Sequence, residues 1–310
     1  MDESVKYFLN MTKTSARSTQ TALSFVSIIY PIVLWLVLFA SCKYIPTDIR
    51  PSIKVELLPY LESFLFRTLP GFLSLTVFSA TIGHFIFPDV NYWKFGLIPG
   101  VLLVLGELVT VDPIPVLDAL LFLPYGVLYY LSPVLFVIFC HLYRTTDLIR
   151  PYCHALGWMN VAGVVTQILI PCAAPWYNDK MGNEPANYSM PGDPAGLVNV
   201  DKLFGTEMYT TAFNSSPLVF GALPSLHSAM AVIFTFFCFK LSTRLGLGSL
   251  VYMCWMWMST IYFRHHYMFD LYLGGVYALV AFKIFYVPSK SFDKSSILPV
   301  HNKDIKSIIL

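Results

Sequence analysis

Two stretches of this apolar chain carry the residue types that could do chemistry. The first, GALPSLHSAMAV (221–232), contains His227, and the second, IYFRHHYMFDLYLGG (261–275), contains His266 and Asp270. His266 and Asp270 are four residues apart, so on a helix they lie one above the other on the same face. A carboxylate there can accept the Nδ1 proton of the imidazole, fix its tautomer and leave Nε2 as a nucleophile.

His227 can supply the complementary proton transfer, because an imidazole has an unperturbed pKa of about 6.5. A general acid that protonates a departing alkoxide contributes roughly 10²–10⁴ in rate. Pro224 suits the first turn of a helix, Ser225 and Ser228 add hydroxyls, and the free N–H groups of that turn form a phosphate cradle. The pattern predicts phosphoryl transfer by His227, His266 and Asp270, with no metal and no cofactor required, although a His/His/Asp set can also bind zinc.

A structural interpretation of the same residues is also open. A single histidine or aspartate at a membrane edge is often a solvated interface residue or part of a hydrogen bond between helices. His265 points away from the face of Asp270 and fits this reading. Ionisable groups at membrane depth are costly, about 2.5–3.5 kcal/mol for Asp. The whole set therefore favours a shared catalytic role.

The elements that position these residues are expected to be membrane helices. Of the 310 residues, 56% are hydrophobic and only 12% are charged, with a mean hydropathy of +0.63, whereas soluble domains carry about 25% charged residues. A spanning helix needs roughly 20 apolar residues, and eight runs approach that length. They are 22–41, 67–88, 95–112, 119–141, 155–174, 226–243, 247–264 and 268–287. We predict an all-α polytopic membrane helix bundle of about six to eight transmembrane helices.

Other properties of the composition narrow the class further. The net charge of +2 does not indicate a nucleic-acid partner. The six cysteines occur singly, without a C-x-x-C pair, and are expected to be small apolar packing residues. The first apolar run is expected to be a membrane helix and not a cleaved signal peptide.

Basic residues predict the orientation of the bundle. Alternating the eight spans places both termini, and eleven of the 20 lysines and arginines, on one side. The long loop 175–224 falls on the other side, where Lys180 and Lys202 are outnumbered by five acidic residues. Because cytosolic loops carry the excess of Lys and Arg, the loop is predicted to be lumenal, with the sequons at Asn187 and Asn214. His227 and His266 then share the lumenal face, joined by two short helices and a tight turn.

The residues of these stretches also resemble a known superfamily. PSLHS followed by H-x-x-x-D is similar to the type 2 phosphatidic acid phosphatase superfamily, although Leu226 replaces a glycine, Thr260 replaces an arginine, and the Lys/Arg motif has no clean counterpart. Over about 120–285 the chain resembles the fungal inositol phosphorylceramide synthase family. The blocks that carry this are FLPYG (122–126), GWMNVAGV (157–164), PCAAPWY (171–177), ANYSMPG (186–192), VDKLFGTEMYTTAFNSS (200–216), FGALPSLHS (220–228) and STIYFRHHYMFDL (259–271).

This resemblance implies a fold and an activity. The fold would have a lipid phosphate phosphatase-like catalytic core, in which His227, His266 and Asp270 take the catalytic positions. The enzyme would transfer phosphoinositol from phosphatidylinositol to ceramide, releasing diacylglycerol, through a phosphohistidine. The family also implies a Golgi membrane location and a small regulatory membrane subunit, while the lumenal active site follows from the predicted topology.

Substrate-binding residues are less clearly marked. Arg264 and Lys202 are the candidate lumenal cations for the phosphate, and Ser225 and Ser228 are candidates at the helix start. Tyr188, with other aromatic residues of the 175–224 loop, is expected to cover the head group; an interfacial aromatic belt is the alternative.

Two other functions and a domain division complete the predictions. A lipid phosphate phosphatase would use the same triad with water as acceptor, and a non-catalytic transporter or scaffold would use the histidines for gating or packing. We divide the chain into N-terminal membrane helices (1–115), a catalytic membrane domain (116–287) and a cytosolic C-terminal tail (288–310).

Overall fold

A computed structural model describes residues 24–86, 97–108 and 114–287. In these residues the regular secondary structure consists of helices alone, as predicted. The all-α class is therefore confirmed. In chain order they are the N-terminal helix Ser24–Tyr44, α2 (Leu57–Arg67), α3 (Leu69–Ile86), α4 (Ile98–Leu108), α5 (Pro115–Phe122), the π-helical η4 (Leu123–Leu128), α6 (Tyr129–Leu142), α7 (Ile149–Leu169), α8 (Pro175–Met181), α9 (Leu197–Phe204), α10 (Met208–Asn214), α11 (Leu226–Leu241), α12 (Thr243–Tyr262) and α13 (Met268–Phe285), with short 3₁₀ turns between some of them.

Each of the eight predicted apolar runs contains a helix. Among the described residues, three helices are long and apolar enough to cross a bilayer: Ser24–Tyr44, the continuous Pro115–Leu142 and α13. A fourth would be the pair α2 and α3, which is bent by 90° at its junction. The predicted tail 288–310 lies outside the described residues, and the predicted boundary at 115 falls at the start of α5.

One face of α6 is apolar and exposed along its length. Tyr130, Val134 and Ile138 recur every four residues and are exposed, while Phe136 and Cys140 are buried. Residues at this spacing share one face of a helix. A continuous exposed apolar face on a bundle helix is expected where the surroundings are lipid and not water.

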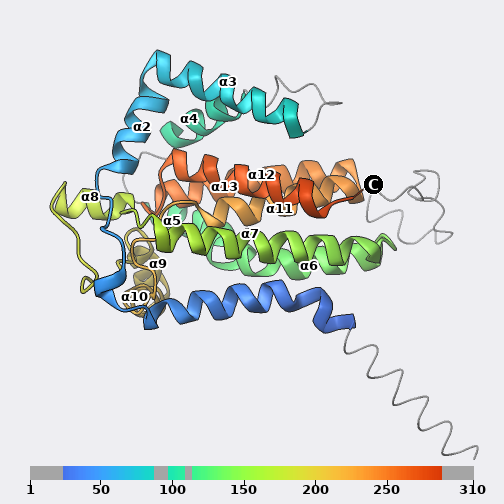
Figure 1. Cartoon of the computed structure of the whole chain (residues 1–310), viewed down its shortest axis with the longest axis horizontal. Coiled ribbons are helices and arrows are strands. Elements are labelled where there is room, and N and C mark those ends of the chain that lie inside the picture. The colour runs from blue at the N-terminus through green and yellow to red at the C-terminus, as the bar shows by residue number, and fades with distance from the viewer. Residues whose placement is uncertain (1–23, 87–96, 109–113, 288–310) are drawn as a thin grey trace, which may run out of the picture.

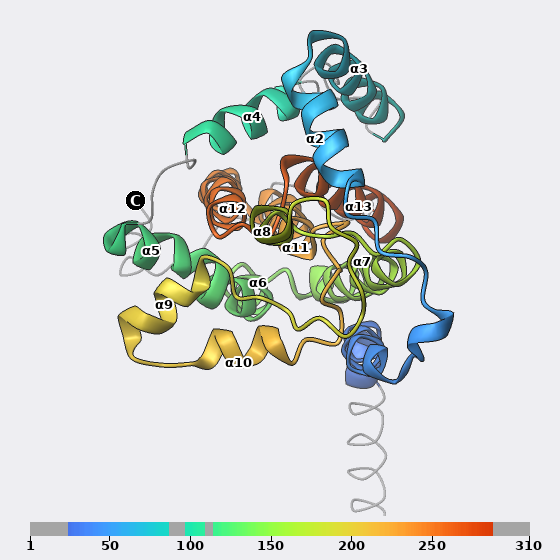
Figure 2. The same ribbon diagram turned by 90° about the vertical axis from the view of Figure 1, so that its left-hand side faces the viewer.

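The bundle core is formed by α6, α7, α11, α12 and α13, which run in similar directions (Figures 1 and 2). α11 lies between its neighbours and packs against the other four. Gly274 of α13 permits one close approach, because a Cβ there would lie 2.3 Å from the carbonyl oxygen of Ser225. This contact places the start of α11 against the first turns of α13, where His227 and Asp270 lie.

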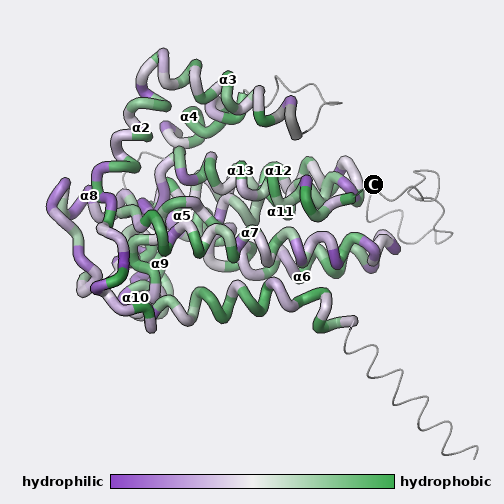
Figure 3. The backbone as a smooth tube through the Cα atoms, in the orientation of Figure 1, coloured by the Kyte–Doolittle hydropathy of each residue, from purple (hydrophilic) through white to green (hydrophobic). Residues whose placement is uncertain are grey.

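One end of the bundle is covered by a layer formed from residues 171–224, which we call the end layer. It contains α8, α9 and α10 (Figure 2), and it is more polar than the helices beneath it (Figure 3). Residues 53–58 pack against it, with an isolated bridge from Lys54 to Cys172, and a second bridge within the layer joins Cys172 to Gly221. The described chain begins and ends at the opposite end of the bundle (Figure 1), as the predicted topology requires.

Asp201 ties two helices of the end layer together. Its carboxylate accepts hydrogen bonds from the amides of Tyr209 and Thr210 and from the hydroxyls of Thr206 and Thr210, at 2.8–3.1 Å. The last residues of α9 are thereby joined to the first turn of α10. All six cysteines are free thiols, and five of them are buried, as expected for packing residues.

Candidate active site

Three of the predicted residues form a continuous hydrogen-bonded chain beneath the end layer. His266 Nδ1 lies 2.7 Å from Asp270 Oδ2, and His266 Nε2 lies 3.3 Å from His227 Nδ1. Asp270 is fully buried and His266 nearly so. The structure therefore brings together the residues that the sequence places 39 positions apart.

The partners of the two imidazoles determine where their protons are. His266 Nδ1–H donates to the carboxylate, so its Nε2 must be the acceptor of the second bond. The proton of that bond then belongs to His227 Nδ1. Burial lowers the pKa of His266, with the backbone carbonyl of Ala222 opposing the shift. His266 is thus neutral at neutral pH, with a lone pair on Nε2, and a donor N–H of His227 is aimed at it.

The start of α11 is held against the neighbouring helices by the two predicted serines. Ser225 Oγ accepts from the amide of Ser228, and the Ser225 amide donates to the backbone carbonyl of Asp270 at 3.0 Å. Ser228 Oγ donates to the Leu271 carbonyl at 2.6 Å and accepts from Trp257 Nε1 at 2.9 Å. Both hydroxyls therefore have structural partners, and Ser228 is fully buried.

Backbone amides in the same turn are still available to an anion. Among the residues that the structure describes, no hydrogen-bond acceptor is found for the amides of Leu226 and His227. They occupy the first turn of a 16-residue helix, where the helix dipole favours negative charge. The predicted phosphate cradle stays a prediction, and these two amides are the groups available to form it.

The turn that carries the second histidine, residues 263–267, is fixed by the end layer. Arg264 has a left-handed backbone (φ 61°), and its guanidinium donates two hydrogen bonds to Asp179, at 2.7 and 2.6 Å. Its carbonyl accepts from the amide of Trp176, and Tyr267 donates to Asn178 at 2.9 Å. In this structure Arg264, predicted to bind phosphate, attaches the turn to α8.

The other two predicted substrate residues lie in the end layer. Lys202 is exposed on α9. The Tyr188 hydroxyl donates to the Pro51 carbonyl at 2.6 Å, and the Arg50 guanidinium lies 5.0 Å from its ring centre.

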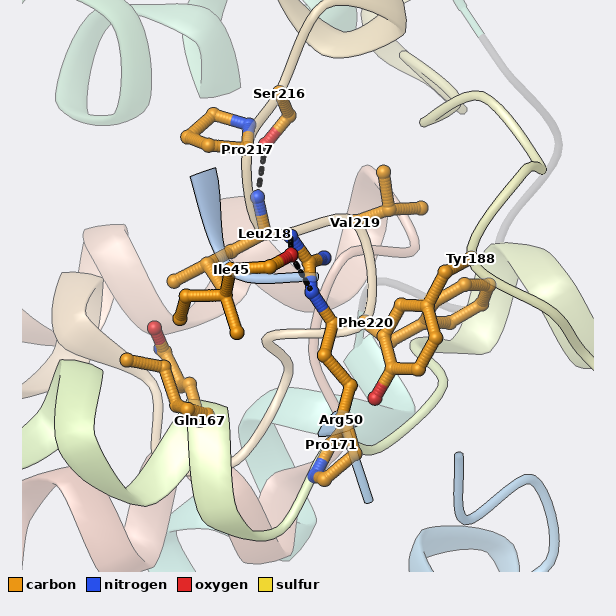
Figure 4. A pocket seen from close by; sticks show the side chains of 11 residues that line it. Ile45, Arg50, Gln167, Pro171, Tyr188, Ser216, Pro217, Leu218, Val219 and Phe220 are labelled. Atoms are coloured by element: carbon orange, nitrogen blue, oxygen red, sulfur yellow. Dashed lines mark hydrogen bonds between the residues drawn. The ribbon is translucent and has the colours of Figure 1, made fainter. Parts of the chain in front are cut away.

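Tyr188 and Arg50 line a cavity that reaches Gln167 of α7 (Figure 4). Arg50 donates to the carbonyls of Cys42 and Ile45, so its charge stabilises the end of the N-terminal helix. Gln167 donates to the Pro224 carbonyl at 3.1 Å. Through Gln167 this cavity adjoins Pro224, which precedes the N-cap of α11. None of His227, His266 and Asp270 lines it.

Several residues of the site were not assigned roles from the sequence. The ring of Tyr125 stacks on His227, and the hydroxyl of Tyr125 contacts His265. Tyr125 belongs to the FLPYG block, and Tyr129 follows it four residues later. This helical spacing is the signal in the sequence that could have placed both tyrosines on one face. Glu62 was also missed, although a single carboxylate in the apolar stretch LLPYLESFLFR of α2 is unusual.

Glu62 holds the first turn of α13 from a distant part of the chain. Its Oε1 accepts from the Met268 amide at 3.2 Å and its Oε2 from the Phe269 amide at 3.1 Å. α13 has no capping side chain of its own. The half-buried carboxylate therefore serves as its N-terminal cap and keeps Asp270 in register with the histidine turn.

We expect Glu62→Ala to destabilise the protein by about 1–2 kcal/mol, because two amides at a helix start lose their acceptor. In thermal unfolding of the detergent-solubilised protein this should lower Tm by roughly 2–8 °C. Glu62→Gln keeps one acceptor oxygen and should fall between. Glu56→Ala, at an exposed position of the same segment without a side-chain cap bond, is the matched control. Equal Tm values for Glu62→Ala and Glu56→Ala would contradict the capping role.

Comparison with known proteins adds family information to this geometry. Residues 104–284 match the PAP2 superfamily. An inositol phosphorylceramide synthase of Candida albicans is 34% identical over 284 residues, covering 90% of this chain and 53% of that protein. The inositol phosphorylceramide synthase catalytic subunits of Schizosaccharomyces pombe and Saccharomyces cerevisiae are 33% and 34% identical, over 81% and 82% of this chain and 51% and 54% of theirs.

The chain spans about half the length of these curated relatives. No solved structure was found to match it. The matched segment, 104–284, contains the two histidines and the aspartate of the hydrogen-bonded chain, together with Tyr125.

Proposed function

The chain belongs to the PAP2 superfamily, and from that premise we propose that it is a phosphotransferase that moves phosphoinositol from phosphatidylinositol to ceramide. The products are inositol phosphorylceramide and diacylglycerol. The observation that carries the proposal is the hydrogen-bonded chain of His227, His266 and Asp270, within a segment similar to fungal inositol phosphorylceramide synthases.

In the first step, His266 Nε2 attacks the phosphorus of phosphatidylinositol. A phosphorus–nitrogen bond forms, and the bond from phosphorus to the diacylglycerol oxygen breaks. His227 acts here as the imidazolium: it gives its Nδ1 proton to that oxygen and becomes neutral, so that diacylglycerol leaves as a neutral alcohol. Asp270 accepts the Nδ1–H of His266 and stabilises the positive charge that the phosphorylated ring acquires.

The two imidazoles must separate for this step. A reactive geometry places nucleophile and phosphorus about 3–3.5 Å apart, with the acid within about 2.6–3.2 Å of the leaving oxygen. The present distance of 3.3 Å between His227 Nδ1 and His266 Nε2 leaves no room for a phosphoryl group between them. Substrate binding is therefore expected to displace His227, since His266 is held by the carboxylate.

In the second step, the primary hydroxyl of ceramide attacks the phosphohistidine. Its proton passes to His227, the new phosphorus–oxygen bond forms, and the bond to His266 Nε2 breaks. Both histidines return to their starting states. The phosphate is neutralised in this scheme by the free amides of Leu226 and His227, with Arg264 and Lys202 as the proposed cations; Arg264 would have to leave Asp179 to take part.

Burial of the site favours transfer to a lipid over hydrolysis. His266 and Asp270 lie under the end layer and away from bulk water, and exclusion of water protects a reactive intermediate. Both proposed lipids reside in the bilayer and would enter from its plane. Tyr188 and its aromatic neighbours are proposed to cover the inositol head group.

We propose that the end layer is lumenal and that the protein resides in the Golgi membrane. The described chain begins and ends at the opposite end of the bundle (Figure 1), and the alternation of the predicted spans assigns eleven of the 20 lysines and arginines to that side. Asn187 and Asn214 lie in the end layer, so lumenal glycosylation is a prediction of the same topology. Two relatives are named as catalytic subunits, which supports a small regulatory membrane subunit. The domain division at 115 and 287 also stays a proposal.

The test is a defined lipid assay with the purified protein. With phosphatidylinositol and ceramide, mass spectrometry is expected to detect inositol phosphorylceramide and an equal amount of diacylglycerol. With phosphatidate alone, little free phosphate is expected. Release of phosphate from phosphatidate without any inositol phospholipid product would establish the lipid phosphate phosphatase instead, and neither product would favour a transporter or scaffold.

A further inference from the structure

Two tyrosine rings hold the imidazole of His227. The Tyr125 ring is stacked on it, with centroids 4.3 Å apart and an interplanar angle of 23°. The Tyr129 ring contacts it at 4.6 Å and 38°. Both tyrosines are buried at the junction of η4 and α6, four residues apart on one face. The hydroxyl of Tyr125 is in turn hydrogen-bonded to a third histidine, His265.

His265 fixes the position of Tyr125. His265 Nε2–H donates to the Pro194 carbonyl at 3.1 Å, so His265 Nδ1 must accept from the Tyr125 hydroxyl, 2.8 Å away. Burial, and then the neighbouring His266, lower the pKa of His265 to about 3, which keeps Nδ1 unprotonated. The ring of His265 is itself stacked on Phe213 of α10, at 4.5 Å and 22°. Both ring nitrogens of His265 therefore have partners: Nε2 is bound to the Pro194 carbonyl, and Nδ1 holds the Tyr125 hydroxyl.

We propose that Tyr125, oriented by His265, is a positioning residue for His227 in its role as general acid and base. The inference deepens the proposed function and rests on it. Neither residue contacts the reacting atoms; each acts through the ring of His227.

The geometry suits the work that His227 must do. His227 has to move away from His266 to admit the phosphoryl group, yet present its N–H to the leaving oxygen within a few tenths of an ångström. A stacked aromatic face allows a ring to slide and turn in its own plane while resisting tilt. The same face stabilises the imidazolium that forms when His227 takes the proton of ceramide.

Leaving-group dependence distinguishes this role from simple packing. Diacylglycerol oxygen needs a proton to depart, whereas 4-nitrophenolate does not. The experiment therefore measures single-turnover rate constants of the first step with two donors: phosphatidylinositol, by diacylglycerol release, and the 4-nitrophenyl ester of inositol phosphate, by nitrophenolate release. His227→Ala is the benchmark, and Tyr125→Ala, Tyr125→Phe and Tyr130→Ala are compared with it.

With phosphatidylinositol, Tyr125→Ala is expected to lose roughly 10²-fold, within the range of a general acid, with little change in KM. With the nitrophenyl donor the loss should be less than about threefold, as for His227→Ala, because no proton is needed. Tyr125→Phe keeps the stacked ring but loses the bond to His265, so its loss should be smaller than that of Tyr125→Ala. Tyr130→Ala removes an exposed tyrosine on the same helix and should match the unmodified protein.

Equal losses of Tyr125→Ala with both donors, while His227→Ala is rescued by the nitrophenyl donor, would overturn the inference and leave the proposed function standing. If His227→Ala itself is not rescued, the acid role of His227 in the proposed function fails. Thermal unfolding of each variant identifies losses of activity that follow from misfolding. If Tyr125→Ala has a lowered Tm, the test uses Tyr125→Phe in its place. Its rate must then still fall more with phosphatidylinositol than with the nitrophenyl donor.

Discussion

Replacing His266 with alanine is expected to lower the rate of phosphoinositol transfer by roughly 10⁴–10⁶-fold, the range seen when a nucleophile of a coupled catalytic group is removed. His266 Nε2 is the protein atom that forms a bond to phosphorus in the proposed scheme. Its loss cannot be offset by His227, whose Nδ1 lies 3.3 Å away, because His227 makes no hydrogen bond to a carboxylate among the residues that the structure describes. The measurement is product formation in the defined lipid assay.

The covalent intermediate provides an independent readout of the same prediction. With phosphorus-labelled phosphatidylinositol and no ceramide, the unmodified protein should retain label that is lost in acid and stable in alkali, as a phosphorus–nitrogen bond requires. His266→Ala should retain none. His141→Ala, which removes an exposed histidine at the end of α6, should label normally. A His266→Ala protein that folds and still transfers phosphoinositol at a tenth of the normal rate would exclude His266 as the nucleophile.

The sequence was sufficient to predict the parts of the site that depend on local spacing. His266 and Asp270 are four residues apart, and the structure places their side chains 2.7 Å apart. The alternation of apolar runs predicted that His227 and His266 share one end of the bundle. Both predictions follow from helix periodicity and from the length of a membrane span, which are properties of short stretches of chain.

Contacts between distant stretches were not predictable in this way. Glu62 reaches the amide of Met268 across 206 residues, and Tyr125 reaches His265 across 140. Arg264 was proposed as a phosphate cation because its charge was visible, while its partner Asp179, 85 residues away, was not. The partner of a polar side chain is set by tertiary packing, and a single sequence does not show it.

Asp270→Asn is expected to reduce kcat by roughly 10²–10⁴-fold with little change in KM, the scale of removing the orienting carboxylate of a triad. The asparagine side chain has the same shape and can still accept the Nδ1–H of His266. It carries no negative charge, so the phosphorylated, positively charged imidazole loses its counter-ion in a buried site. The loss should therefore fall on the chemical step and not on lipid binding, and kinetics with varied phosphatidylinositol will separate the two.

A matched substitution tests whether the loss of activity in Asp270→Asn comes from removing the negative charge at position 270. Asp179→Asn also removes a carboxylate near the histidine turn, but from an exposed pair with Arg264. Such pairs contribute about 0–1 kcal/mol, so the activity of Asp179→Asn should fall by less than about tenfold. The backbone carbonyl of Asp270 accepts from Ser225 and is unchanged in Asp270→Asn, which argues that the contact between α11 and α13 survives. If Asp270→Asn and Asp179→Asn lose activity equally, Asp270 serves the fold and not the nucleophile.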